Sequence, residues 1–134
     1  MLFFVSIGWS YGQNDWKPVT ETQNGIEFSQ KKVEWQDISN GVHSEVILVR
    51  ITNTNDQTAE VSWQDERYYN GKCYACGSEE SFHTLTLAPG ETREGELVFG
   101  KTGNGLRIFV RSMNGRTETQ LTDFKIHDIQ VALQ

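Results

Sequence analysis

The stretch VILVRITNTNDQTAEVSW, residues 46–63, contains two apolar segments and the turn between them. From Val46 to Ile51 only Arg50 is polar, which is typical of a central strand that is covered on both faces. Asn55-Asp56 supplies turn residues, and the chain then continues with Val61 and Trp63 on one side and polar residues on the other. We therefore expect two strands of a β-protein, with Trp63 packed in its core.

The rest of the chain is divided into short segments by five Asn-Gly pairs, at residues 24–25, 40–41, 70–71, 104–105 and 114–115. Both residue types tolerate the positive φ that type I′ hairpin turns require. Apolar residues alternate with polar ones between these turns, and the alternation changes parity between Ile126 and Ile129, which predicts a β-bulge near Asp128. The pattern predicts an all-β fold, an antiparallel β-sandwich of immunoglobulin or fibronectin type III kind with about seven or eight strands. A jelly roll or a small barrel is the alternative.

Length and charge restrict the classes of function. The chain has 134 residues, enough for one domain, which we expect over residues 14–134. Its formal net charge is -6, and its basic residues are scattered along the sequence, which argues against binding to nucleic acid or to anionic membranes. No apolar run is long enough to span a bilayer. We expect no cofactor.

The first thirteen residues, MLFFVSIGWSYGQ, differ from the remainder of the chain. An apolar run is followed by small residues and then by a polar start at Asn14, as in the apolar and cleavage regions of a secretory signal peptide. The basic residues that usually begin such a peptide are missing, and a buried first strand is the alternative interpretation. We expect a signal peptide at residues 1–13 and a mature protein that is periplasmic or secreted.

The segment YYNGKCYACGSEESFH, residues 68–83, contains both cysteines of the chain, three residues apart. Export to an oxidising compartment favours a structural disulfide between Cys73 and Cys76. A redox pair would need a thiolate at the start of a helix, which nothing near Cys73 predicts. A metal site could use Cys73, Cys76 and His83, although structural zinc requires a fourth ligand.

Three tyrosines surround the cysteines, and exposed aromatic rings in sugar-binding sandwiches stack on the apolar faces of pyranose rings. Tyr68, Tyr69 and Tyr74 are therefore candidates for a ligand-binding rim. The alternative is that they only cover the edges of a sheet.

No catalytic group of residues emerges from the sequence. The segment GELVFGKT, residues 95–102, satisfies the phosphate-loop pattern, but Gly103-Asn104-Gly105 cannot begin the helix that such a loop needs, and we expect a hairpin loop at residues 100–105. Asp65 and Glu66 are neighbours on a strand and so point to opposite faces. We expect a non-catalytic binding or structural module with a protein or glycan partner. The alternatives are a carbohydrate-binding module and a metal-binding or thiol-redox protein.

Several features together resemble a group of small, uncharacterised exported β-sandwich proteins of flavobacteria and other Bacteroidetes. They are the NTN turn, the V-x-W strand, the NGKC-x-x-C loop, the L-x-PGE turn and the closing LT-x-F-x-I strand, which together span most of the mature chain. The resemblance implies export and a β-sandwich fold, and it implies no catalytic residue.

Overall fold

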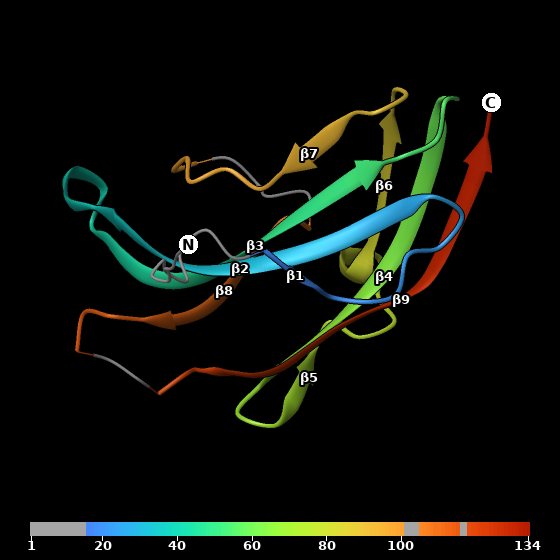
Figure 1. Ribbon diagram of the computed structural model, residues 1–134. Coiled ribbons are helices and arrows are strands. Elements are labelled where there is room, and N and C mark those ends of the chain that lie inside the picture. The colour runs from blue at the N-terminus through green and yellow to red at the C-terminus, as the bar shows by residue number, and fades with distance from the viewer. Residues whose placement is uncertain (1–15, 101–104, 116–117) are drawn as a thin grey trace, which may run out of the picture.

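The computed structural model describes residues 16–100, 105–115 and 118–134, and in these ranges the chain forms two antiparallel β-sheets packed face to face (Figure 1). The all-β sandwich expected from the sequence is confirmed, while the immunoglobulin or fibronectin type III topology stays a prediction. The expected signal peptide at residues 1–13 lies outside the described residues. None of the described segments is a helix long and apolar enough to cross a membrane.

Sheet A contains five strands and is centred on β3. β2 pairs with the whole of one edge of β3, β1 pairs with β2, and both β7 and β8 pair with the other edge of β3. The strands are β1 (Lys17–Pro18), β2 (Ile26–Asp37), β3 (Val42–Asn53), β7 (Thr92–Glu94) and β8 (Arg107–Ser112).

Sheet B is centred on β4, which pairs with β5 and β6 along one edge and with β9 along the other. Its strands are β4 (Ala59–Tyr69), β5 (Lys72–Tyr74), β6 (Phe82–Leu87) and β9 (Leu121–Leu133). The outer edge of β9 has no strand partner among the described residues. Nine strands are thus described, more than the seven or eight expected, because three of them contain only two or three residues each.

The core lies between the sheets, where the inward-facing side chains of β2, β3, β4 and β8 meet. Trp63 on β4 is fully buried, as expected, and its ring meets Phe28 of β2 edge-on, with ring centroids 5.4 Å apart. Val49 and Ile51 of β3 are also fully buried. Val46 and Leu48 point to the opposite face of sheet A and are nevertheless buried, so β3 is the central strand that its apolar sequence predicts.

Two of the Asn-Gly pairs form the expected type I′ turns. Asn24-Gly25 (φ 50° and 78°) closes the turn before β2, and Asn70-Gly71 (φ 53° and 82°) joins β4 to β5. At residues 40–41 and 114–115 only the glycine has positive φ, and the β2–β3 connection is a 3₁₀ turn, Ile38–Asn40, that ends at Gly41. Part of the hairpin loop expected at residues 100–105 lies outside the described residues.

The expected β-bulge is confirmed at Asp128, which has a φ of 53°. Ser62 on β4 is opposite Gln130, whereas Gln64 is opposite His127, so two residues of β9 occupy the length of one residue of β4. The extra residue allows Ile126 and Ile129 to point toward the same core despite their odd spacing.

Asn53, at the end of β3, is a fully buried polar residue that joins two turns. Its Nδ2 donates hydrogen bonds to the carbonyl oxygens of Gln57 (2.9 Å), Leu87 (3.1 Å) and Ala88 (3.1 Å). Its Oδ1 accepts a hydrogen bond of 3.0 Å from the backbone N–H of Asn55. The turn that follows β3 is therefore tied to the end of β6.

Candidate functional site

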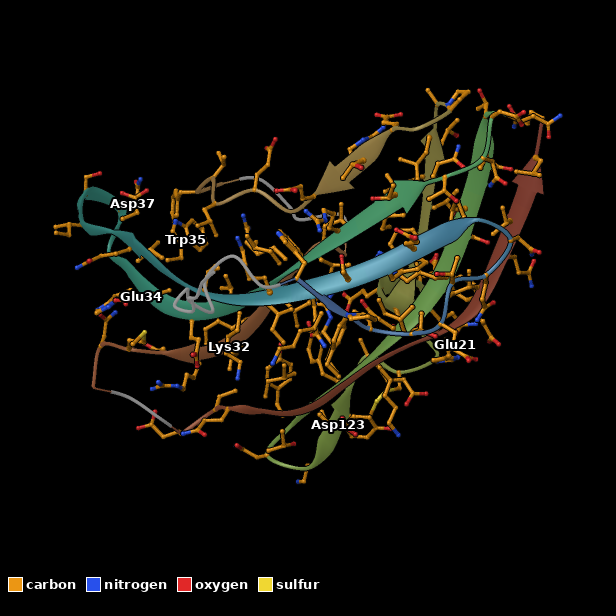
Figure 2. All side chains as sticks on the ribbon, in the orientation of Figure 1. Glu21, Lys32, Glu34, Trp35, Asp37 and Asp123 are labelled. Atoms are coloured by element: carbon orange, nitrogen blue, oxygen red, sulfur yellow. A yellow bond between two sulfur atoms is a disulfide. The ribbon has the colours of Figure 1, made fainter. Side chains whose placement is uncertain are left out.

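A hollow of about 450 Å³ opens between the two sheets, where β2 faces β9. Gln30 and Lys32 of β2 and Ile47 of β3 form its wall on sheet A, and residues 121–124 of β9 form the wall on sheet B. Lys17 of β1, which pairs with Gln30, lies at its rim together with Lys31. Figure 2 shows Lys32 on the side of β2 that faces β9, and Asp123 on β9 itself. We call this hollow the inter-sheet groove.

The inter-sheet groove carries two ammonium groups, from Lys17 and Lys32, which lie on the same face of sheet A as Gln30. Lys31 points to the outer face of the sheet, where its ammonium lies 4.8 Å from the centre of the Trp16 ring, a cation–π contact. Neither Lys17 nor Lys32 forms an ion pair with any described carboxylate. Asp123 of β9 pairs with Tyr68, so its carboxylate lies on the outer face of sheet B, 3.8 Å from the ammonium of Lys125.

Elsewhere in the described structure, arginines are bound by acidic partners. Arg67, Arg93 and Arg111 lie 3.2, 3.2 and 3.0 Å from Asp65, Glu91 and Glu45, respectively, and Arg50 lies 3.9 Å from Glu94. The basic residues are scattered along the sequence, as noted above, but the fold brings Lys17 and Lys32 together at one groove. In a chain of net charge -6, the inter-sheet groove is therefore a local site of positive charge.

The two cysteines lie in the loop that begins with β5. The Cα atoms of Cys73 and Cys76 are 5.8 Å apart, within the range that a disulfide spans. Cys73 is part of a strand, so no helix begins there to lower the pKa of a thiol, as a redox pair of thioredoxin type requires. The arrangement fits a pair that closes a small loop.

His83 is separated from the cysteines by its position in sheet B. It pairs with Trp63 on the core side of the sheet, where its Nε2 lies 3.0 Å from the carboxylate of Asp65. Cys73 instead pairs with Tyr68, which lies at a position of the opposite parity on β4. The structure therefore does not bring Cys73, Cys76 and His83 together, and no group of three or more His, Cys, Asp or Glu side chains among the described residues could hold a metal ion.

The three tyrosines do not form one rim either. Tyr68 and Tyr69 are neighbours on β4 and point to opposite faces of sheet B. The Tyr68 hydroxyl donates a hydrogen bond of 2.8 Å to Glu66, which raises the pKa of Tyr68.

Tyr69 instead forms an aromatic cluster with Tyr74 and Phe109. Its ring centre lies 6.1 Å from that of Tyr74 and 6.3 Å from that of Phe109, and its hydroxyl donates a hydrogen bond of 2.7 Å to the Phe109 carbonyl. Partial burial of this ring raises the pKa of Tyr69. Tyr74 and Phe109 are the exposed members, with 57% and 37% of their surfaces accessible.

Asp65 and Glu66 point to opposite faces, as the sequence predicts. Asp65 is buried on the core side with His83 and Arg67, whereas Glu66 lies 3.2 Å from His127 on the outer face of sheet B. These carboxylates cannot act together on one substrate.

The chain matches no protein-family model, no curated protein and no solved structure. Its resemblance to exported proteins of flavobacteria stays a prediction.

Proposed function

We propose that this chain is an exported, non-catalytic binding module whose ligand occupies the inter-sheet groove. The observation that carries the proposal is the groove itself. Ligand sites are concave, with volumes of about 300–1,000 Å³, and combine apolar walls with a few polar groups that fix the orientation of the ligand. The inter-sheet groove has a volume of about 450 Å³, and apolar Ile47 and Phe124 lie among its polar lining residues.

The chemistry of the lining supports binding. The polar side chains on the inner face of sheet A at the groove are the Gln30 amide and the ammonium groups of Lys17 and Lys32. Such groups hold a ligand by charge and hydrogen bonds. They come from the paired strands β1 and β2, so the fold fixes their relative positions.

The experiment that tests the binding site fills the groove. Gln30→Trp places a large ring in the inter-sheet groove, while Thr84→Trp places the same ring on the exposed outer face of sheet B. A ligand screen by thermal unfolding should find compounds that stabilise the parent protein and the Thr84→Trp control but not Gln30→Trp. Ligands that stabilise all three proteins equally would refute the assignment of the groove.

Export is supported by the apolar residues 1–13 and by the disulfide-range spacing of Cys73 and Cys76. The test is cell fractionation of a bacterial host that expresses the chain with and without residues 1–13, followed by alkylation of free thiols. We expect the chain with residues 1–13 to appear outside the cytoplasm with both cysteines inaccessible to alkylation. A protein that stays in the cytoplasm with two free thiols would overturn this part of the proposal.

A second candidate function is carbohydrate binding by the aromatic cluster, supported by the exposure of Tyr74 beside Tyr69 and Phe109. Tyr74→Ala should then abolish binding on a glycan array. Tyr68→Ala, which alters the opposite face of sheet B, is the matched control. Equal loss with both variants, or no loss with either, would reject this site.

A further inference from the structure

We infer that the ligand of the inter-sheet groove is an anionic saccharide, a sugar chain that carries carboxylate or sulfate groups; this inference rests on the groove being the binding site. Charge provides the first argument. Lys17 and Lys32 lack carboxylate partners among the described residues, whereas four described arginines have them. The groove therefore brings together two positive charges that no described carboxylate neutralises.

The spacing of the lysines suits several anionic groups in a row. Lys17 pairs with the segment of β2 at Gln30, and Lys32 lies two residues further along β2 on the same face. From the spacing between strands and the rise along a strand, the Cα atoms of Lys17 and Lys32 lie about 8 Å apart. Two flexible ammonium groups at this separation can each contact a charge on a successive unit of a chain.

The remaining lining of the groove suits a sugar ring. Ile47 is buried in the wall of sheet A, and Leu121 and Phe124 pack partly against the core on the side of β9. These side chains offer apolar surface to the apolar face of a pyranose. The Gln30 amide lies on the same face of sheet A as Lys17 and Lys32 and can bond with hydroxyl groups.

A saccharide fits these features better than a nucleic acid. Arginine forks usually bind the phosphates of nucleic acids, and aromatic faces stack on their bases. The groove is lined by lysines rather than arginines, and its aromatic residue, Phe124, packs partly against the core. A chain of net charge -6 also repels a long polyanion beyond the groove.

The test is calorimetric titration with four probes: a hexasaccharide of galacturonic acid, a heparin hexasaccharide, neutral maltohexaose and a single-stranded (dT)12 oligonucleotide. We expect one or both anionic saccharides to bind, and binding to weaken as salt screens the exposed charges. The double variant Lys17→Gln/Lys32→Gln should raise the Kd about tenfold, equivalent to about 1.4 kcal/mol. Lys72→Gln removes one such charge from an exposed position on β5 and should leave the Kd within about twofold.

The outcomes separate this inference from the proposed function. If maltohexaose binds as tightly as the acidic sugars and Gln30→Trp abolishes its binding, the groove stands as the binding site and the anionic ligand is wrong. If the oligonucleotide binds as tightly as the saccharides, the groove recognises charge alone and the saccharide class is wrong. If neither anionic saccharide binds, the inference is overturned; the proposed function fails as well only when the ligand screen yields no compound whose binding depends on the groove.

Discussion

Replacement of Asn53 tests whether one buried amide holds two turns of the sandwich together. In Asn53→Ala the carbonyls of Gln57, Leu87 and Ala88 lose their donor, and the N–H of Asn55 loses its acceptor. Nδ2 has only two hydrogens, and Oδ1 accepts from both the N–H and the Nδ2 of Asn55, so the variant loses about four full hydrogen bonds. At about 1 kcal/mol each, the free energy of unfolding should fall by about 4 kcal/mol.

For a chain of this length, such a loss lowers Tm by about 15 °C. The assay is urea unfolding followed by the fluorescence of the chain's tryptophans, among them buried Trp63, together with calorimetric measurement of Tm. Asn114→Ala is the matched control, because Asn114 is exposed in a turn and its side chain makes no hydrogen bond to the described residues; its effect should stay below about 0.5 kcal/mol. A loss below about 1 kcal/mol in Asn53→Ala would refute the role assigned to this amide.

Asn53→Asp extends the test to pH. An ionised carboxylate at this buried site would face carbonyl oxygens with no hydrogen to donate, which raises the pKa of the new carboxyl above its usual value of about 3.9. A raised pKa in the folded state means that stability is retained below the pKa of the unfolded chain and is lost as pH rises above it. The difference in stability between Asn53→Asp and the parent should therefore be smaller at pH 3 than at pH 7. A difference that does not change with pH would contradict this explanation.

Three further predictions concern other parts of the fold. Tyr69→Phe removes a hydrogen bond to a β8 carbonyl and should cost about 1 kcal/mol. Because partial burial raises the pKa of Tyr69, stability should fall as pH rises above 10, and this fall should be smaller in the variant. In Gly25→Ala the new residue would have a φ of +78°, and its Cβ would lie 2.5 Å from Asn55 Oδ1. In Gly115→Ala the φ is +84° but nothing lies near the Cβ, so only the backbone strain of a left-handed residue, about 1–2 kcal/mol, applies. Urea unfolding should show a clearly larger loss in Gly25→Ala, and equal losses would mean that the Asn55 side chain moves away at no cost. Replacing both cysteines with serine should lower stability by about 2 kcal/mol, the entropy of a small closed loop, and added zinc should not shift the Tm of the parent protein.

The fold was largely predictable because its signals are local in sequence. The apolar run at residues 46–51, the alternation around Trp63 and the Asn-Gly turn at residues 70–71 each depend on a few adjacent residues. The bulge at Asp128 was predictable for the same reason, since the change of parity between Ile126 and Ile129 is visible within one segment.

The candidate site was not predictable, because it depends on which strands face each other. Lys17 and Lys32 line one groove because β9 packs opposite them, and β9 lies some ninety residues further along the chain. No local sequence pattern indicates that packing. The pairing of His83 with Asp65 likewise depends on the register between β6 and β4. Neighbouring residues on a strand point to opposite faces of the sheet, which separates Tyr68 from Tyr69 as it separates Asp65 from Glu66. The sequence was therefore enough to predict that these two tyrosines do not share a rim.

The bulge at Asp128 has a consequence for how copies of this protein meet in a crowded compartment. β9 is a strand of thirteen residues whose outer N–H and C=O groups have no strand partner among the described residues, and such a strand can template the stacking of further chains into fibrils. The extra residue at Asp128 bends the backbone and breaks the regular row of donors and acceptors. A second copy can then align with only a short run on either side of the bend, which opposes uncontrolled growth of the sheet.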